Sequence, residues 1–93
     1  MIYAYVNLTL TDPDALAKYR EKAGAALARH GATPLVSAKD TTVLEGSPTQ
    51  PSIAVILQFP DREAALGWIN DPEIADVHAL RRAAGQSDIL LLG

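Results

Sequence analysis

The sequence predicts one α+β domain over residues 1–93, with its elements in the order β-α-β-β-α-β. Three observations support this prediction. Apolar and more polar residues alternate along residues 2–10, as they do in a strand. Apolar residues recur at helical spacing over residues 13–30 and again over residues 61–84. Residues 53–57 form a continuous apolar, β-branched run, which is typical of a central strand.

The first strand and the first helix have clear faces and boundaries. One face of the strand is wholly apolar, whereas the other carries Tyr3 and Tyr5 in place of charged residues. This second face is only partly suited to water, so we expect another surface to cover it. The helix begins with Asp12 as its cap and Pro13 at its first position, and Gly31 ends it.

The segment between the first helix and the central strand allows two assignments. Residues 34–38 predict a short strand, residues 39–41 interrupt it, and residues 42–45 resume the pattern. We expect either one long strand with a bulge or bend, or two short strands. Residues 46–51 are rich in turn-forming residues and predict a loop.

The second helix is expected in two parts. Asp61 caps its start, and Asn70-Asp71-Pro72 breaks it, because a residue before proline avoids the helical conformation. Asp71 then caps a second part that continues to Gly85. Residues 89–92 are apolar and predict a short final strand.

This order of elements is the ferredoxin-like pattern, a four-stranded antiparallel sheet with its helices on one face. In that topology the first and third strands are central and the last strand is an edge. The apolar edge strand and the face with Tyr3 and Tyr5 both lack cover within one chain. We therefore predict a symmetric homodimer that packs sheet against sheet.

Composition argues against several classes of function. The chain has no cysteine, which rules out disulfides and thiolate metal ligands, and its two histidines do not suggest a metal site. A net charge of −3 without a basic cluster argues against nucleic acid as a partner. No apolar run approaches the ~20 residues that span a bilayer, and no targeting segment is evident. We expect a cytoplasmic protein without membrane contact and without a bound cofactor.

Several short motifs follow one another in a fixed order: Leu44-Glu45-Gly46, Gln58-Phe59-Pro60, residues 63–68, Asn70-Asp71-Pro72-Glu73 and Leu80-Arg81. Together they resemble the DUF1330 family, a bacterial family of unknown function in the dimeric α/β-barrel superfamily. The resemblance implies a ferredoxin-like protomer, a dimer whose two sheets form a barrel, and sites in hollows between sheet and helices. It implies no reaction. Where the family commonly has aromatic rings, this chain has Ile69 and Ile74, so a pocket wall there is expected to be more aliphatic.

The candidate site residues centre on the second helical region. His78 and Arg81 are three residues apart and share a helix face, and histidine transfers protons near neutral pH. Arg81 lies on the apolar stripe, where a guanidinium needs a carboxylate or a ligand, and Glu45 is the internal candidate. We predict a hollow with His78 as the candidate catalytic residue and with these candidate ligand-binding residues: Arg81, Tyr19, Asn70, Trp68, Glu45 and Tyr5.

These residues also have structural interpretations. His78 and Arg81 could lie on a solvated face, with Arg81 offsetting the negative end of its helix, while Trp68 packs in the core and Tyr5 fills the dimer interior. The function expected first is binding of a small neutral or anionic organic molecule. One alternative is a cofactor-independent monooxygenase or a muconolactone-isomerase-like enzyme, as among relatives in the superfamily. The other is a structural or accessory dimer without catalysis.

Overall fold

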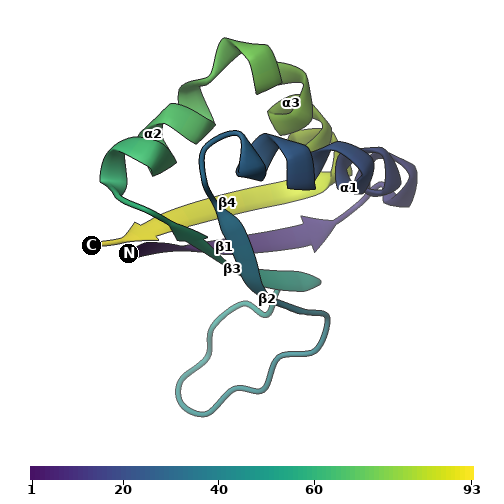
Figure 1. Ribbon diagram of the computed structural model, residues 1–93. Coiled ribbons are helices and arrows are strands. Elements are labelled where there is room, and N and C mark those ends of the chain that lie inside the picture. The colour runs from purple at the N-terminus through teal and green to yellow at the C-terminus, as the bar shows by residue number, and fades with distance from the viewer.

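The computed structural model describes residues 1–93 and has the predicted order of elements (Figure 1). The strands are β1 (Ile2–Leu10), β2 (Thr33–Ala38), β3 (Ile53–Phe59) and β4 (Gly85–Leu92). The helices are α1 (Pro13–Ala28), α2 (Arg62–Asn70) and α3 (Ala75–Ala84), and a short 3-10 helix, η1 (Pro72–Ile74), separates the last two.

The strands form one antiparallel sheet in the order β2-β3-β1-β4. β1 and β3 are therefore central and β4 is an edge, as predicted. The helices cover one face of the sheet and leave the other open (Figure 1). Ala4, Val6 and Leu8 are buried on the helix side, whereas the intervening Tyr3 and Tyr5 belong to the open face. The α+β, ferredoxin-like fold is thus confirmed.

The predicted caps set the start of α1 and α2. The Asp12 carboxylate accepts hydrogen bonds from the backbone N–H groups of Asp14 and Ala15 at 3.0 and 3.2 Å. Asp61 caps α2 in the same way, by accepting from the backbone N–H of Ala64 at 2.8 Å. Each carboxylate satisfies N–H groups that have no partner within the helix, so these short sequence signals fix where the helices begin.

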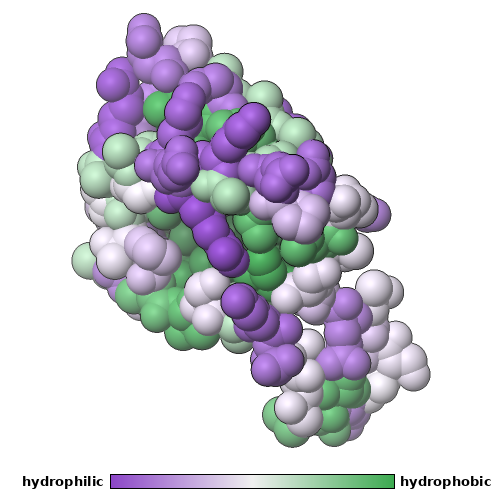
Figure 2. All heavy atoms as spheres, turned by 90° about the vertical axis from the view of Figure 1, so that its right-hand side faces the viewer, coloured by the Kyte–Doolittle hydropathy of each residue, from purple (hydrophilic) through white to green (hydrophobic).

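The segment after β2 differs from the prediction. A register shift does occur in this hairpin, but it lies between Pro34 and Val36 and not at residues 39–41, where the bulge or bend is expected. Residues 42–45, however, do not form a strand, and the strand predicted there is wrong. Residues 39–52 instead form a loop that extends from the open side of the sheet (Figure 1). In Figure 2 this loop projects below the body of the molecule and carries a hydrophobic group near its tip.

Proline explains why the hairpin stops early. The pairing of β2 with β3 places Ala38 opposite Ala54. If that register continued, Pro51 and Pro48 would occupy positions in the ladder. Neither has an N–H group to donate to a neighbouring strand, so the sheet cannot extend through them.

Gly85 joins α3 to β4 without an intervening loop. A Cβ atom at this position would collide with the backbone carbonyl of Thr9. Gly85→Ala is therefore expected to lower the free energy of unfolding by about 1–3 kcal/mol, measured by urea unfolding. Gly24→Ala is the matched control, because a Cβ there meets nothing within 4 Å and alanine is favoured in a helix by up to ~1 kcal/mol. Equal stability of the two variants would contradict the close approach at Gly85.

Candidate functional site

Four of the predicted site residues come together between α1, α2 and α3. His78 and Arg81 are each only 3% exposed, so the solvated-face interpretation is wrong for both. The guanidinium carbon of Arg81 lies 5.2 Å from the centroid of the Trp68 ring and 5.8 Å from that of Tyr19. The His78 ring meets Trp68 edge-on, with centroids 4.7 Å apart. We call these four residues the Arg81 cluster.

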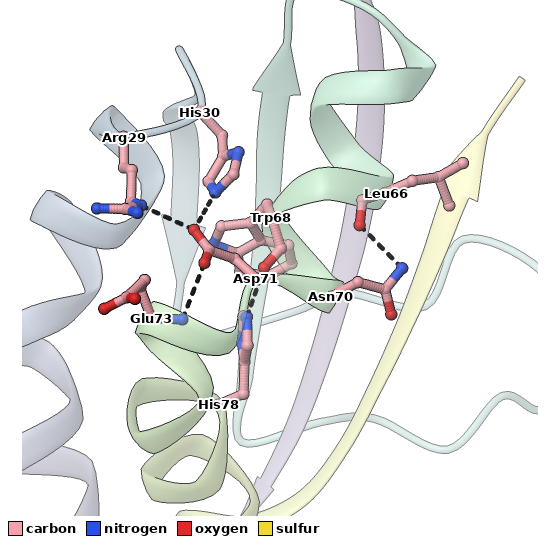
Figure 3. Close-up of polar contacts among 8 residues, drawn as sticks. All are labelled: Arg29, His30, Leu66, Trp68, Asn70, Asp71, Glu73 and His78. Carbon is pink, nitrogen blue, oxygen red and sulfur yellow. Dashed lines mark hydrogen bonds and ion pairs between the residues drawn. The ribbon is translucent and has the colours of Figure 1, made fainter.

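His78 supplies a hydrogen bond that the broken helix lacks. In a continuous helix the Trp68 carbonyl would accept from the backbone N–H of residue 72, but Pro72 has none. Nε2 of His78 lies 2.8 Å from that carbonyl oxygen and donates to it (Figure 3). Nδ1 then accepts from Nη1 of Arg81 at 2.7 Å. Both ring nitrogens of the neutral imidazole are therefore engaged.

The surroundings of His78 favour its neutral form. Burial lowers the pKa of His78 from its usual 6.5, the hydrogen bond to the Trp68 carbonyl raises it in part, and the nearby charges of Arg81 and Arg82 lower it further. The net pKa is lowered. This agrees with the hydrogen bonds, because a protonated Nδ1 could not accept from Arg81.

This lowered pKa predicts how stability depends on pH. Below pH 6.5 the unfolded chain takes up a proton on His78 more readily than the folded chain does, because the pKa of His78 is lowered in the folded chain. The free energy of unfolding is therefore expected to fall as the pH drops from about 6.5, by up to about 1.4 kcal/mol per pH unit. Urea unfolding between about pH 7.5 and 5.5 measures this slope. His78→Gln should remove His78's share of it, and an unchanged slope in that variant would contradict the assignment.

Arg81 has no carboxylate partner. Its Nε donates to the Ser87 hydroxyl at 3.3 Å and its Nη1 donates to His78. Glu45 is exposed in the loop on the other side of the sheet, so the predicted Glu45–Arg81 pair is wrong. The error follows from the missing strand at residues 42–45. Neutral acceptors and two aromatic rings surround the charge instead.

An apolar hollow of about 150 Å³ lies against Trp68 and is partly open to solvent. It is formed mainly by α2 and β4, with one residue each from β1 and β3, and every lining side chain is hydrophobic. Tyr19, His78 and Arg81 do not line it. The principal walls are Ala65, Leu66, Trp68, Ile69, Ile89 and Leu91.

The remaining predicted residues lie elsewhere. Asn70 is exposed, and its side-chain amide donates to the Leu66 carbonyl at 3.0 Å (Figure 3). Tyr5 and Glu45 line a second hollow of about 430 Å³, which the loop of residues 39–52 forms beside the open face. The structure therefore divides the single predicted site among the Arg81 cluster, the apolar hollow and the open face.

Asp71 has a role that the sequence did not reveal beyond its cap. Its carboxylate accepts from Nε of Arg29 and Nε2 of His30, both at 2.8 Å, and from the backbone N–H of Glu73 at 2.9 Å (Figure 3). These bonds, first that from Glu73 and then that from His30, lower the pKa of Asp71 from 3.8 to about 2. Asp71 thus ties the end of α1 to the break after α2. The sequence signal that could have indicated this role is the pair of adjacent basic residues at the end of α1, Arg29 and His30.

Two further features bear on function. No three histidine, aspartate or glutamate side chains are grouped in a way that could hold a metal ion. None of the helices combines the length and the apolar character that a membrane crossing needs.

The family model described as a domain of unknown function, DUF1330, matches residues 1–93. The chain belongs to the DUF1330 family. No curated protein sequence shows significant similarity to it.

Solved structures share the fold. A protein of unknown function from Rhodopseudomonas palustris has 21% identity and a TM-score of 0.76, over 98% of this chain and 79% of the other. A dimeric ferredoxin-like protein of unknown function from Jannaschia has 18% identity and a TM-score of 0.68, over 99% and 97%. A cofactor-independent oxygenase from Streptomyces nogalater has 15% identity and a TM-score of 0.61, over 99% and 89%. At these identities the similarity shows the fold alone.

Proposed function

We propose that this DUF1330 protein binds a small organic molecule in the apolar hollow beside Trp68. The hollow itself carries the proposal, because it is a partly open space of about 150 Å³ lined only by hydrophobic side chains. Soluble proteins hold small molecules mainly in concave, largely apolar sites of this kind. Its place between sheet and helices is also the place that the family resemblance implies.

Two other members of the Arg81 cluster, His78 and Arg81, serve to position Trp68, which is the largest side chain that lines the hollow. His78 holds the Trp68 carbonyl and contacts the edge of its ring, and Arg81 lies over that ring. Asn70 has a similar place, because it binds the carbonyl of Leu66, which also lines the hollow. We therefore assign these side chains as positioning residues, while Trp68 itself contacts the ligand.

We further propose that the functional unit is a homodimer joined through the open faces of the sheets. Leu90 and Leu92 on this face are 62% and 52% exposed, and they lie opposite Tyr5 and Tyr3 in the β1–β4 pairing. Val36, on β2, adds a side chain that is 54% exposed. Contiguous apolar area of this kind usually marks an interaction surface. The Jannaschia protein, which has the same fold, is described as dimeric, and this supports the proposal.

Trp68 provides the test of ligand binding, because it is the only tryptophan. We expect members of a panel of small organic molecules to change its fluorescence in a saturable way. Ala65→Leu, which fills the hollow from α2, should abolish that change. Ala83→Leu makes the same substitution at an exposed position on α3 and should leave it intact. If the protein is folded and Trp68 responds to no member of the panel, the proposed ligand binding is contradicted. The remaining interpretation is then a structural or accessory dimer.

An enzymatic function is the second candidate. The shared fold with the oxygenase from Streptomyces nogalater and with an antibiotic biosynthesis monooxygenase, at a TM-score of 0.57, favours it. Here His78 is the candidate catalytic base, and it must release Arg81 to free Nδ1. Turnover of phenolic or lactone substrates that is lost in His78→Gln would support this function. Absence of turnover by the wild-type protein would exclude it for those substrates.

A further inference from the structure

The walls of the apolar hollow offer at most one neutral hydrogen-bond donor to a charged group. Its lining side chains are all hydrophobic, and they carry no hydroxyl, amide or charged atom that could serve a ligand apart from the Trp68 indole N–H. That N–H is itself buried and has no hydrogen-bond partner. A carboxylate moved from water into such surroundings would exchange its full hydration for at most this one neutral donor, which is strongly unfavourable. The wall chemistry therefore selects for neutral molecules.

Arg81 does not change this conclusion, although it is buried near Trp68. Its guanidinium lies over the Trp68 ring, and two of its nitrogens donate to Ser87 and His78. It does not line the hollow. An anion held in the hollow would therefore have no direct contact with this cation.

The size of the hollow limits the ligand to about one ring. A cavity of about 150 Å³ lined by aliphatic and aromatic side chains takes up benzene in another protein. Two fused rings exceed that space, so part of the second ring would lie outside the hollow unless the close-packed walls move. Leu66 lines the hollow and is 43% exposed, so a short substituent on the ring could extend past it toward solvent.

An aromatic wall suits a ring. Trp68 lines the hollow, and its ring packs against the fully buried ring of Phe59, with centroids 5.6 Å apart and planes inclined by 54°. A ligand ring can meet the Trp68 ring in edge-to-face or offset contact. We infer that the ligand is a neutral molecule whose buried part is a single apolar ring of benzene size. This inference rests on the proposed function and names its ligand class.

Three probes test the expected selectivity for a neutral ligand and for a single ring. Toluene and benzoate have the same ring but differ in charge, and 1-methylnaphthalene adds a second fused ring to toluene. Because Trp68 is the only tryptophan, its indole N–H gives one resonance in a ¹⁵N–¹H correlation spectrum, which follows each titration without optical overlap. We expect toluene to bind at least tenfold more tightly than either other probe. Ala65→Leu should abolish toluene binding, and Ala83→Leu should not.

The outcomes separate this inference from the proposed function. If benzoate or 1-methylnaphthalene binds as tightly as toluene and Ala65→Leu blocks it, the hollow is a binding site but the inferred ligand class is wrong. If no probe shifts the Trp68 resonance of the folded wild-type protein, the inference fails and so does the hollow as a site for these molecules. Should Ala65→Leu not fold, Ala65→Val fills less of the same space and should weaken toluene binding.

Discussion

Replacing His78 by alanine is expected to lower the free energy of unfolding by about 4 kcal/mol. The substitution leaves the Trp68 carbonyl without a donor, because Pro72 cannot supply one. It also removes the acceptor of Arg81. Each buried polar group left unpaired costs roughly 1–3 kcal/mol, and the void left by the ring adds to this loss. Urea unfolding followed by circular dichroism measures the change.

Two further variants separate the hydrogen bonds of His78 from its packing. His78→Gln retains a side-chain N–H that can donate to the Trp68 carbonyl, so it should recover part of the lost stability. His30→Ala removes the other histidine, whose side chain is 19% exposed, and should cost less. If His78→Ala lost no more stability than His30→Ala, the proposal that the His78 hydrogen bond to the Trp68 carbonyl stabilises the helix break would be wrong.

Leu90→Asp is expected to convert the homodimer into monomers at micromolar concentration. Because the dimer has two-fold symmetry, a substitution at an interface residue occurs twice in the interface. Burying one leucine contributes about 1.5–3 kcal/mol, and the aspartates that replace the two leucines must also lose water. The dissociation constant should therefore rise by more than about a hundredfold. Sedimentation velocity over a range of concentrations measures this change.

Leu66→Asp is the matched control for Leu90→Asp. Leu66 is also an exposed leucine, but it lies on α2, on the helix side of the sheet. This variant should remain dimeric. A wild-type protein that sediments as a monomer at micromolar concentration would contradict the dimer, whereas a dimeric Leu90→Asp protein would show that the interface lies elsewhere.

The fold was predictable because several local signals agree with one another. The alternation in β1 matches its two faces, Asp12 and Asp61 cap the helices, and Pro72 interrupts the second helical stretch. Residues 42–45 were misassigned because their apolar pattern resembles a strand. Whether such a segment joins a sheet depends on what lies opposite it, and there the register brings prolines that cannot pair.

The candidate site was predictable only in part. Helical spacing brings His78 and Arg81 onto one face, but their contacts with Tyr19 and Trp68 depend on how separate helices pack. The residues that the sequence indicates as site candidates are polar or aromatic. The hollow is instead lined by residues such as Ala65, which cannot be told from ordinary core residues in the sequence.

A crystal of the protein soaked with bromobenzene would test the proposed ligand site most directly. We expect an anomalous bromine peak in each protomer, inside the hollow between Trp68 and β4, with the ring against Ala65 and Leu91. The proposal would be contradicted if the hollow remained empty or were filled by the protein's own side chains while bromobenzene bound elsewhere.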